Sequence, residues 1–84
     1  MLASITVRYF AAAAAAAGLQ EETVDLPAGA SFDDLTRLLA SRGPELERVL
    51  ARCSFLHNGV AVRDRSQRPK SGAVVDVLPP FAGG

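Results

Sequence analysis

Two stretches near the start of the chain alternate apolar with polar residues. From residue 3 to residue 9 every second side chain is apolar, and this period predicts a strand with one buried face. Residues 23–26 repeat the alternation before Pro27, which cannot donate a hydrogen bond to a strand ladder. We therefore expect two strands, with Tyr9 in the core.

A run of seven alanines at positions 11–17 lies between these strands and ends at Gly18. Alanine is the strongest helix former, and glycine accepts the left-handed conformation that closes many helices. A helix this short is marginal in isolation, so we expect it to be held by packing on the sheet.

The longest helical pattern begins at Ser31. Asp34 stands three residues further on, which is the spacing of a capping box with Asp in place of Glu, and leucines then recur at helical spacing. Gly43 and Pro44 end this main helix, and Pro44 also suits the first turn of another helix over residues 44–50. The predicted apolar stripe of the main helix comprises Leu35, Leu38 and Leu39.

The second half of the chain predicts a hairpin and a final strand. Asn58-Gly59 favours a tight β-turn, and residues 74–78 form a β-branched run that Pro79 and Pro80 end. No linker or repeat divides the chain. The pattern predicts one α+β domain over residues 1–80, with a mixed five-stranded sheet curled around one main helix, and a tail at residues 81–84.

Composition narrows the class of protein. The 84 residues suffice for one small core, and nine basic against nine acidic residues give no overall field toward nucleic acid or an anionic membrane. The longest apolar run, residues 10–19, is about half as long as a bilayer span. No secretion signal precedes the first strand, so we expect a cytoplasmic protein. Cys53 is the single cysteine, which excludes an internal disulfide and a cysteine-based zinc site.

The last four residues suit a terminus that other proteins handle. No large side chain follows Phe81, and four extended residues reach roughly 13 Å. Because Gly83 and Gly84 lack Cβ atoms, they pass through a channel too narrow for side chains. We expect the carboxylate of Gly84 to carry the chemistry.

The chain as a whole resembles the MoaD and ThiS family of ubiquitin-like sulfur carriers, and most closely the MoaD branch. The resemblance rests on four motifs: ITVRYFAAAAAAAGLQEETVDLP, S-FDDLTRLLASRGPEL, FLHNGVAV and VVDVLPPFAGG. It implies a β-grasp fold with no bound cofactor and no metal. Two features depart from the family pattern, the all-alanine helix and Ala73, where relatives commonly carry an aspartate.

The resemblance also implies a mechanism. The terminal carboxylate is ionised at neutral pH and is a poor electrophile, so a MoeB-type, E1-like adenylyltransferase would use ATP to form an acyl-adenylate. Sulfur from a donor protein would displace AMP and leave a thiocarboxylate. A MoaE-type large subunit, joined to this chain in a heterotetramer, would receive the tail and pass the sulfur to cyclic pyranopterin monophosphate. Catalytic side chains are expected on that large subunit.

Site residues follow from the resemblance and from the tail itself. The resemblance implies that Gly84 is the adenylation and thiocarboxylate site, and that Gly83 and Ala82 thread it into the partner. An aromatic residue beyond the last strand suits a partner interface, and the basic loop at 63–70 suits an acidic docking surface or plain solvation. The predicted partner contacts are Phe81, Pro80, Phe10, Arg63 and Arg65.

Other reactive side chains have structural explanations. His57 lacks a second histidine at metal-ligand spacing. Cys53 has no base near it in sequence, and cysteine is among the residues most often buried. Asp33 and Asp34 fall in a first helical turn, where the helix dipole favours acids.

Three other functions remain open. One is a ThiS-type carrier or a carrier for cysteine synthesis, although the helix at 44–50 and the LPPFAGG ending favour the molybdopterin branch. Another is a ubiquitin-like modifier that joins lysines through Gly84. The third is a purely structural interaction module, which would keep its function without Gly83 and Gly84.

Overall fold

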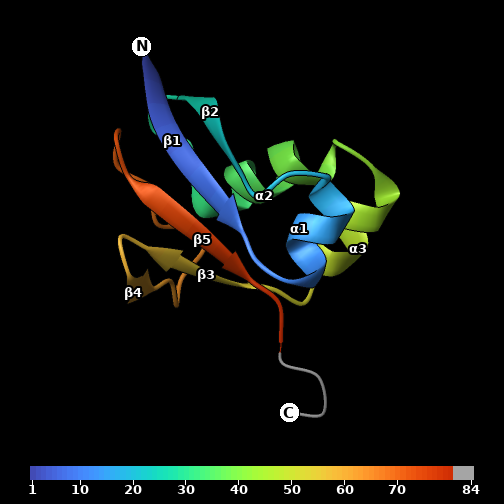
Figure 1. Ribbon diagram of the computed structural model, residues 1–84. Coiled ribbons are helices and arrows are strands. Elements are labelled where there is room, and N and C mark those ends of the chain that lie inside the picture. The colour runs from blue at the N-terminus through green and yellow to red at the C-terminus, as the bar shows by residue number, and fades with distance from the viewer. Residues whose placement is uncertain (81–84) are drawn as a thin grey trace.

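One face of a β-sheet carries the three helices found within residues 1–80 (Figure 1). The computed structural model describes residues 1–80. The elements are β1 (Leu2–Tyr9), α1 (Ala12–Ala17), β2 (Glu21–Pro27), α2 (Phe32–Ala40), α3 (Pro44–Leu50), β3 (Ser54–His57), β4 (Val60–Ala61) and β5 (Val74–Leu78). Each lies where the sequence pattern predicts an element.

The sheet has five strands in the order β2-β1-β5-β3-β4. The central pair, β1 and β5, is parallel, and the other pairs are antiparallel. The mixed five-stranded sheet of the sequence-based prediction is therefore confirmed. Because β1 and β5 run the same way, both end at one edge of the sheet, with Tyr9 opposite Val77.

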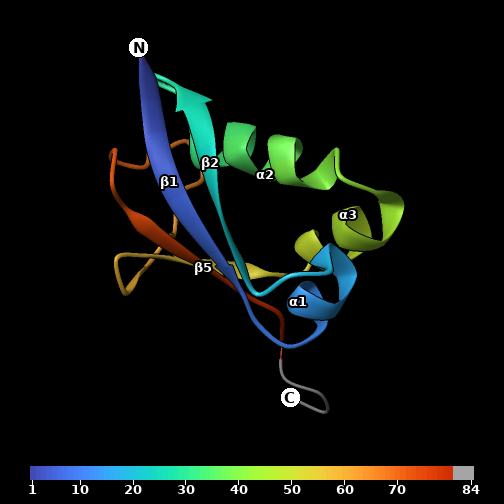
Figure 2. The ribbon, with the colours of Figure 1, turned by 45° about the horizontal axis from the view of Figure 1, so that its top comes forward.

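The core lies between the sheet and α2, which crosses the sheet on its helical side (Figure 2). Alternate residues of β1, including Tyr9, are buried as predicted, and they belong to the same core cluster as the buried residues of α2. The prediction is wrong for one residue of the apolar stripe: Leu38 is 36% exposed. Phe32 is buried in α2 instead, together with Leu35 and Leu39.

Local signals explain where α2 begins. The Ser31 Oγ accepts a hydrogen bond from the Asp34 backbone N–H at 3.2 Å, and the Asp34 carboxylate accepts one from the Ser31 N–H at 2.9 Å. This capping box satisfies donors that a helix start leaves unpaired. Two more N–H groups, of Phe32 and Asp33, donate to the carbonyls of Gln67 and Arg65, so the long loop before β5 is fastened to α2.

The alanine helix α1 packs beside α3 at the edge where β1 ends (Figures 1 and 2). Ala13 is fully buried. Gly18 closes the helix at φ 78°, as predicted, and its N–H donates to the Ala14 carbonyl. The turn into the helix requires φ 51° and ψ −125° at Ala11, a conformation that favours glycine.

Within residues 1–80, no helix combines the length and apolar character required to cross a bilayer.

Candidate functional site

Two of the predicted site residues, Phe10 and Pro80, lie just beyond the edge of the sheet where β1 and β5 end; Figure 1 shows the two strands ending together. Phe10 follows β1 directly, and its N–H donates to the Val77 carbonyl of β5 at 3.2 Å. The side chain of Phe10 stays 38% exposed. An apolar ring thus lies on the surface beside the end of β5, as a partner contact requires.

Two prolines stop β5 at this edge. Proline has no N–H to donate and a fixed φ, so Pro79 and Pro80 cannot extend the ladder beyond Leu78. The chain therefore leaves the sheet here. The predicted Phe81, Ala82, Gly83 and Gly84 lie outside the described residues.

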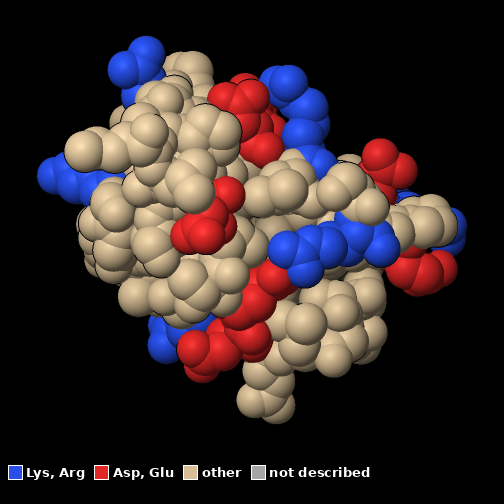
Figure 3. Space-filling view, turned by 90° about the horizontal axis from the view of Figure 1, so that it is seen from above, with Lys and Arg blue, Asp and Glu red and all other residues tan. Residues whose placement is uncertain are grey.

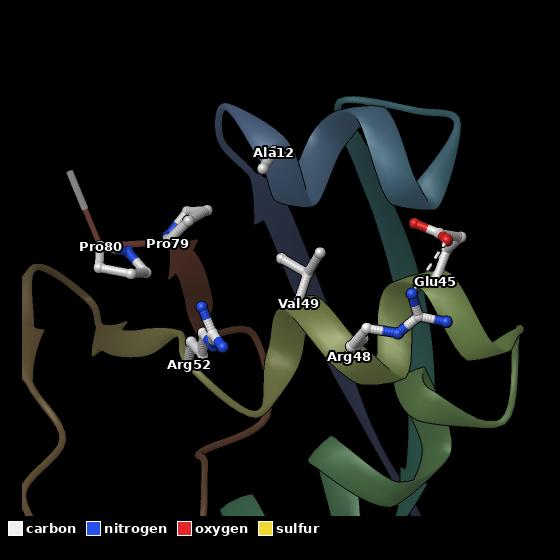
Figure 4. Close-up of a pocket in the computed structure, with 7 residues that line it drawn as sticks. All are labelled: Ala12, Glu45, Arg48, Val49, Arg52, Pro79 and Pro80. Atoms are coloured by element: carbon white, nitrogen blue, oxygen red, sulfur yellow. Dashed lines mark ion pairs between the residues drawn. The ribbon is translucent and has the colours of Figure 1, made fainter. Parts of the chain in front are cut away.

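A groove of about 350 Å³ lies beside the two prolines. It is formed by α1, α3 and the end of β5, and Figure 4 shows Val49 pointing from α3 toward α1, with Arg52 on the side of Pro79. The groove is lined by Ala12, Glu45, Arg48, Val49, Arg52, Pro79 and Pro80.

Positive charge marks the rim of this groove. Arg48 approaches Glu45 at 3.6 Å, and both side chains are about three-quarters exposed, so that ion pair contributes little. Arg52 is exposed and forms no ion pair with any of residues 1–80. On the face seen in Figure 3, acidic and basic residues also lie next to one another.

The outer face of the sheet carries a two-bond ion pair at the same edge. Arg8 of β1 donates from Nε and Nη2 to the two carboxylate oxygens of Asp76 of β5, at 2.6 and 3.0 Å. The hydrogen bonds to Asp76 raise the pKa of Arg8. The guanidinium also lies 5.6 Å from the centroid of the Phe10 ring, which holds that ring against the sheet.

On the inner side, Tyr9 links the edge to the turn between α2 and α3. Its hydroxyl donates to Glu22 at 2.6 Å, and the second carboxylate oxygen of Glu22 lies 2.7 Å from Arg42. Burial, and then the hydrogen bond to Glu22, raise the pKa of the Tyr9 phenol. These contacts hold the C-terminal end of β1 in place next to the candidate site.

The two loop arginines differ in their surroundings. Arg63 is exposed. Arg65 donates to the Cys53 carbonyl at 2.7 Å, and its guanidinium lies 4.7 Å from the Phe55 ring centroid. Arg65 therefore seals the core beneath the loop, and partner contact by either arginine remains a prediction.

The residues that we explained structurally have structural partners. Cys53 is buried, its thiol donates to the Val49 carbonyl, and burial raises the pKa of that thiol. His57 accepts a hydrogen bond from the Lys70 N–H at 3.3 Å and meets the Phe32 ring edge-on. Among residues 1–80 no three His, Cys, Asp or Glu side chains gather as a metal site would require.

Sequence reasoning missed the groove and the Arg8–Asp76 pair. The α3 residues of the groove do carry a signal, since Glu45, Arg48 and Val49 recur at helical spacing. The ion pair joins residues 68 positions apart, and no local pattern predicts such a pair. What this edge offers chemically is apolar surface and guanidinium groups, which bind an apolar or anionic segment.

Comparison with known proteins agrees with this architecture. The profile of the ThiS family matches residues 7–84. A molybdopterin synthase sulfur carrier subunit of Chlamydomonas reinhardtii is 36% identical over 81 residues, which cover 95% of this chain and 98% of that protein.

Solved structures share the fold along almost the whole chain. A putative molybdopterin converting factor subunit 1 from Pyrococcus furiosus superposes with a TM-score of 0.85 at 30% identity, covering 94% of this chain and 99% of the other. The small archaeal modifier protein 1 of H. volcanii gives 0.82 at 26% identity, with 94% and 99% covered. Subunits 1 and 2 of the molybdopterin-converting factor from Helicobacter pylori were solved as a complex. A chain of that complex superposes with a TM-score of 0.65 at 25% identity, covering 96% of this chain and 99% of the other.

These matches confirm the expected β-grasp, ubiquitin-like fold. With the family profile matched from β1 through Gly84, the chain belongs to the ThiS family.

Proposed function

We propose that this protein is the sulfur carrier subunit of a molybdopterin synthase. The observation that carries the proposal is the 36% identity to a protein of that name, across 98% of its length. The position of the end of β5 supports it, because Pro79 and Pro80 direct the chain off the sheet beside exposed Phe10.

The reacting group in this proposal is the carboxylate of Gly84. A carboxylate oxygen attacks the α-phosphate of ATP on a MoeB-type, E1-like enzyme, and pyrophosphate leaves. The terminal sulfur of a persulfide donor then displaces AMP, and a thiol cleaves the resulting acyl disulfide to leave the thiocarboxylate. Activation is required because an ionised carboxylate is a poor electrophile.

The partner in the second step is a MoaE-type large subunit, which brings the catalytic side chains. The complex of subunits 1 and 2 from Helicobacter pylori supports a pairing of this kind. Phe10 and Pro80 at the strand edge, with Phe81 beyond them, supply apolar contacts, and Arg63 and Arg65 supply charge. Gly83 and Ala82 occupy the narrow part of the partner's channel.

A transfer assay tests this proposal. The thiocarboxylated protein is incubated with a large subunit and cyclic pyranopterin monophosphate, and the dithiolene product is measured. We expect one sulfur lost from the carrier for each sulfur gained by the pterin. An intact thiocarboxylate after incubation, with no dithiolene, would defeat the assignment.

Two tail variants sharpen this assay. A chain with one alanine added after Gly84 moves the carboxylate away from the reacting position, and we expect it to support no transfer. An alanine added instead at the N-terminus, next to the fully exposed Met1, gives the same increase in length and leaves the C-terminus unchanged. We expect that matched control to transfer sulfur.

A second candidate function is conjugation to protein lysines through Gly84. The likeness to small archaeal modifier protein 1 favours it specifically. Isopeptide-linked adducts of Gly84, recovered from cells that contain the protein and identified by mass spectrometry, would support conjugation. If adducts form and the transfer assay fails, conjugation replaces sulfur transfer as the function.

A further inference from the structure

The groove between α1, α3 and the end of β5 has a mixed character that the fold itself does not require. Its floor is apolar, with Val49 and Ala12 facing each other across it. Its rim carries Arg48 and Arg52, of which Arg48 already has Glu45 beside it. An occupant that fits would bring one apolar side chain and one negative charge.

The part of the chain beyond Pro80 has this composition. Phe81 directly follows Pro80, which itself lines the groove. The remaining residues are Ala82, Gly83 and Gly84, so the only charge is that of the terminal carboxylate. An aromatic ring and an anion thus lie within three residues of each other, which is close enough for both to enter one groove.

The dimensions also agree. Val49 and Arg52 are close together, because the turn after α3 brings the Arg52 N–H to 3.0 Å from the Val49 carbonyl, to which it donates a hydrogen bond. Four extended residues reach roughly 13 Å. The segment is therefore long enough to place the Phe81 ring over Val49 and its last residue near Arg52, with length left for a turn at the two glycines.

We propose that this groove is the docking site of the chain's own residues 81–84. The Phe81 ring lies on Val49 and Ala12, and the Gly84 carboxylate pairs with Arg52. The proposal takes from the proposed function only that Gly84 ends the chain. A docked tail is withheld from partner proteins, so docking and delivery compete for the same four residues.

Methyl NMR on the full-length protein tests the docking. We expect nuclear Overhauser effects between the Phe81 ring and the Val49 methyl groups. A chain ending at Pro80 and the substitution Phe81→Ala should both shift the Val49 and Ala12 methyl resonances in the same direction. Both changes leave residues 1–80 unaltered in sequence, so we expect the methyl resonances away from the groove to stay in place.

Arginine variants test the charge. An exposed ion pair is worth 0.2–1 kcal/mol, which converts to about a 1.4- to 5-fold change in an equilibrium. We expect Arg52→Gln to lower the docked-to-free ratio of the tail by that factor. Arg63→Gln is the matched control, since it removes the same charge from an exposed position outside the groove, and we expect it to leave the ratio unchanged.

Three results would overturn the proposal. Val49 and Ala12 resonances that are identical in the full-length and shortened chains would show an empty groove. Shifts that vanish on dilution would show that the tail occupies the groove of a second copy. Equal effects of Arg52→Gln and Arg63→Gln would show general charge attraction instead of a site. Whether Gly84 gains sulfur is measured in a separate experiment. Success or failure of that experiment leaves the docking proposal untouched.

Discussion

Asp76 is the one charged residue that is buried among residues 1–80, at 7% exposure. It lies on the outer face of β5, where Arg8 satisfies both carboxylate oxygens. A buried carboxylate without its partner destabilises a fold more than the loss of the pair as a whole, because desolvation is no longer offset. The pair therefore holds together the two strands that end at the functional edge.

Single and double substitutions of Arg8 and Asp76 should differ in the free energy of unfolding. We expect Arg8→Leu to lower the free energy of unfolding more than the double substitution Arg8→Leu with Asp76→Leu, because the second change removes the unpaired carboxylate. Urea denaturation of both variants and the unsubstituted protein measures this. A double variant less stable than Arg8→Leu alone would contradict the interpretation of Asp76.

The backbone conformation of Ala11 also affects stability. It holds φ 51° and ψ −125° at the turn from β1 into α1, which is strained for a residue with a Cβ. We expect Ala11→Gly to raise the free energy of unfolding by about 1 kcal/mol, since relief of strain exceeds the added chain entropy. Thermal and urea denaturation measure the change.

The matched control is the same substitution inside the helix. Ala15→Gly, at an exposed position of α1, should lower the free energy of unfolding by about 1 kcal/mol. Changes of the same sign at both positions would show that Ala11 is not strained.

At the scale of elements, the starts and ends of helices and strands could be predicted from neighbouring residues. The Ser31–Asp34 capping box, the αL residue Gly18 and the turn at Asn58-Gly59, with φ 49° and 85°, all act within a few positions. The exposure of Leu38 could not be predicted, because three leucines at helical spacing do not say which of them faces the sheet. Long-range packing placed Phe32 there instead.

The cap of α2 also predicts how stability depends on pH. Hydrogen bonds from the Ser31 N–H, and then from its hydroxyl, lower the pKa of Asp34 below its ordinary 3.8. Because the folded pKa is the lower one, the carboxylate stabilises the fold above pH 3.8 and this contribution is lost as the pH falls through the folded value. We expect Asp34→Asn to destabilise the protein at pH 7 and to approach the unsubstituted protein in stability at low pH.

Ser31→Ala is the control for that titration. This substitution removes an uncharged hydrogen-bond acceptor and should lower the free energy of unfolding by about 1 kcal/mol. Because the hydroxyl does not titrate, part of that loss should remain at low pH. Denaturation at a series of pH values compares the two variants. A difference between Asp34→Asn and the unsubstituted protein that stays constant in acid would contradict the role of the carboxylate.

At the scale of the whole molecule, the fold assembles one edge from parts that are distant in sequence. The ends of β1 and β5, the first residue of α1 and the last turn of α3 meet around Pro79 and Pro80. The strand pattern and the double proline predicted where the chain leaves the sheet. The groove could not be predicted, because it exists only where α1 and α3 pack together beside β5.

In the proposed function, the carboxylate of Gly84 is converted to a thiocarboxylate. The most direct measurement is the intact mass of the protein after incubation with an E1-like enzyme, ATP, a persulfide donor and a thiol. Replacement of oxygen by sulfur at the ionised terminus predicts a gain of about 16 Da, confined to the C-terminal peptide and absent without ATP. An unchanged mass, with an enzyme that charges another ThiS-family protein in the same mixture, would contradict the conversion of Gly84 to a thiocarboxylate.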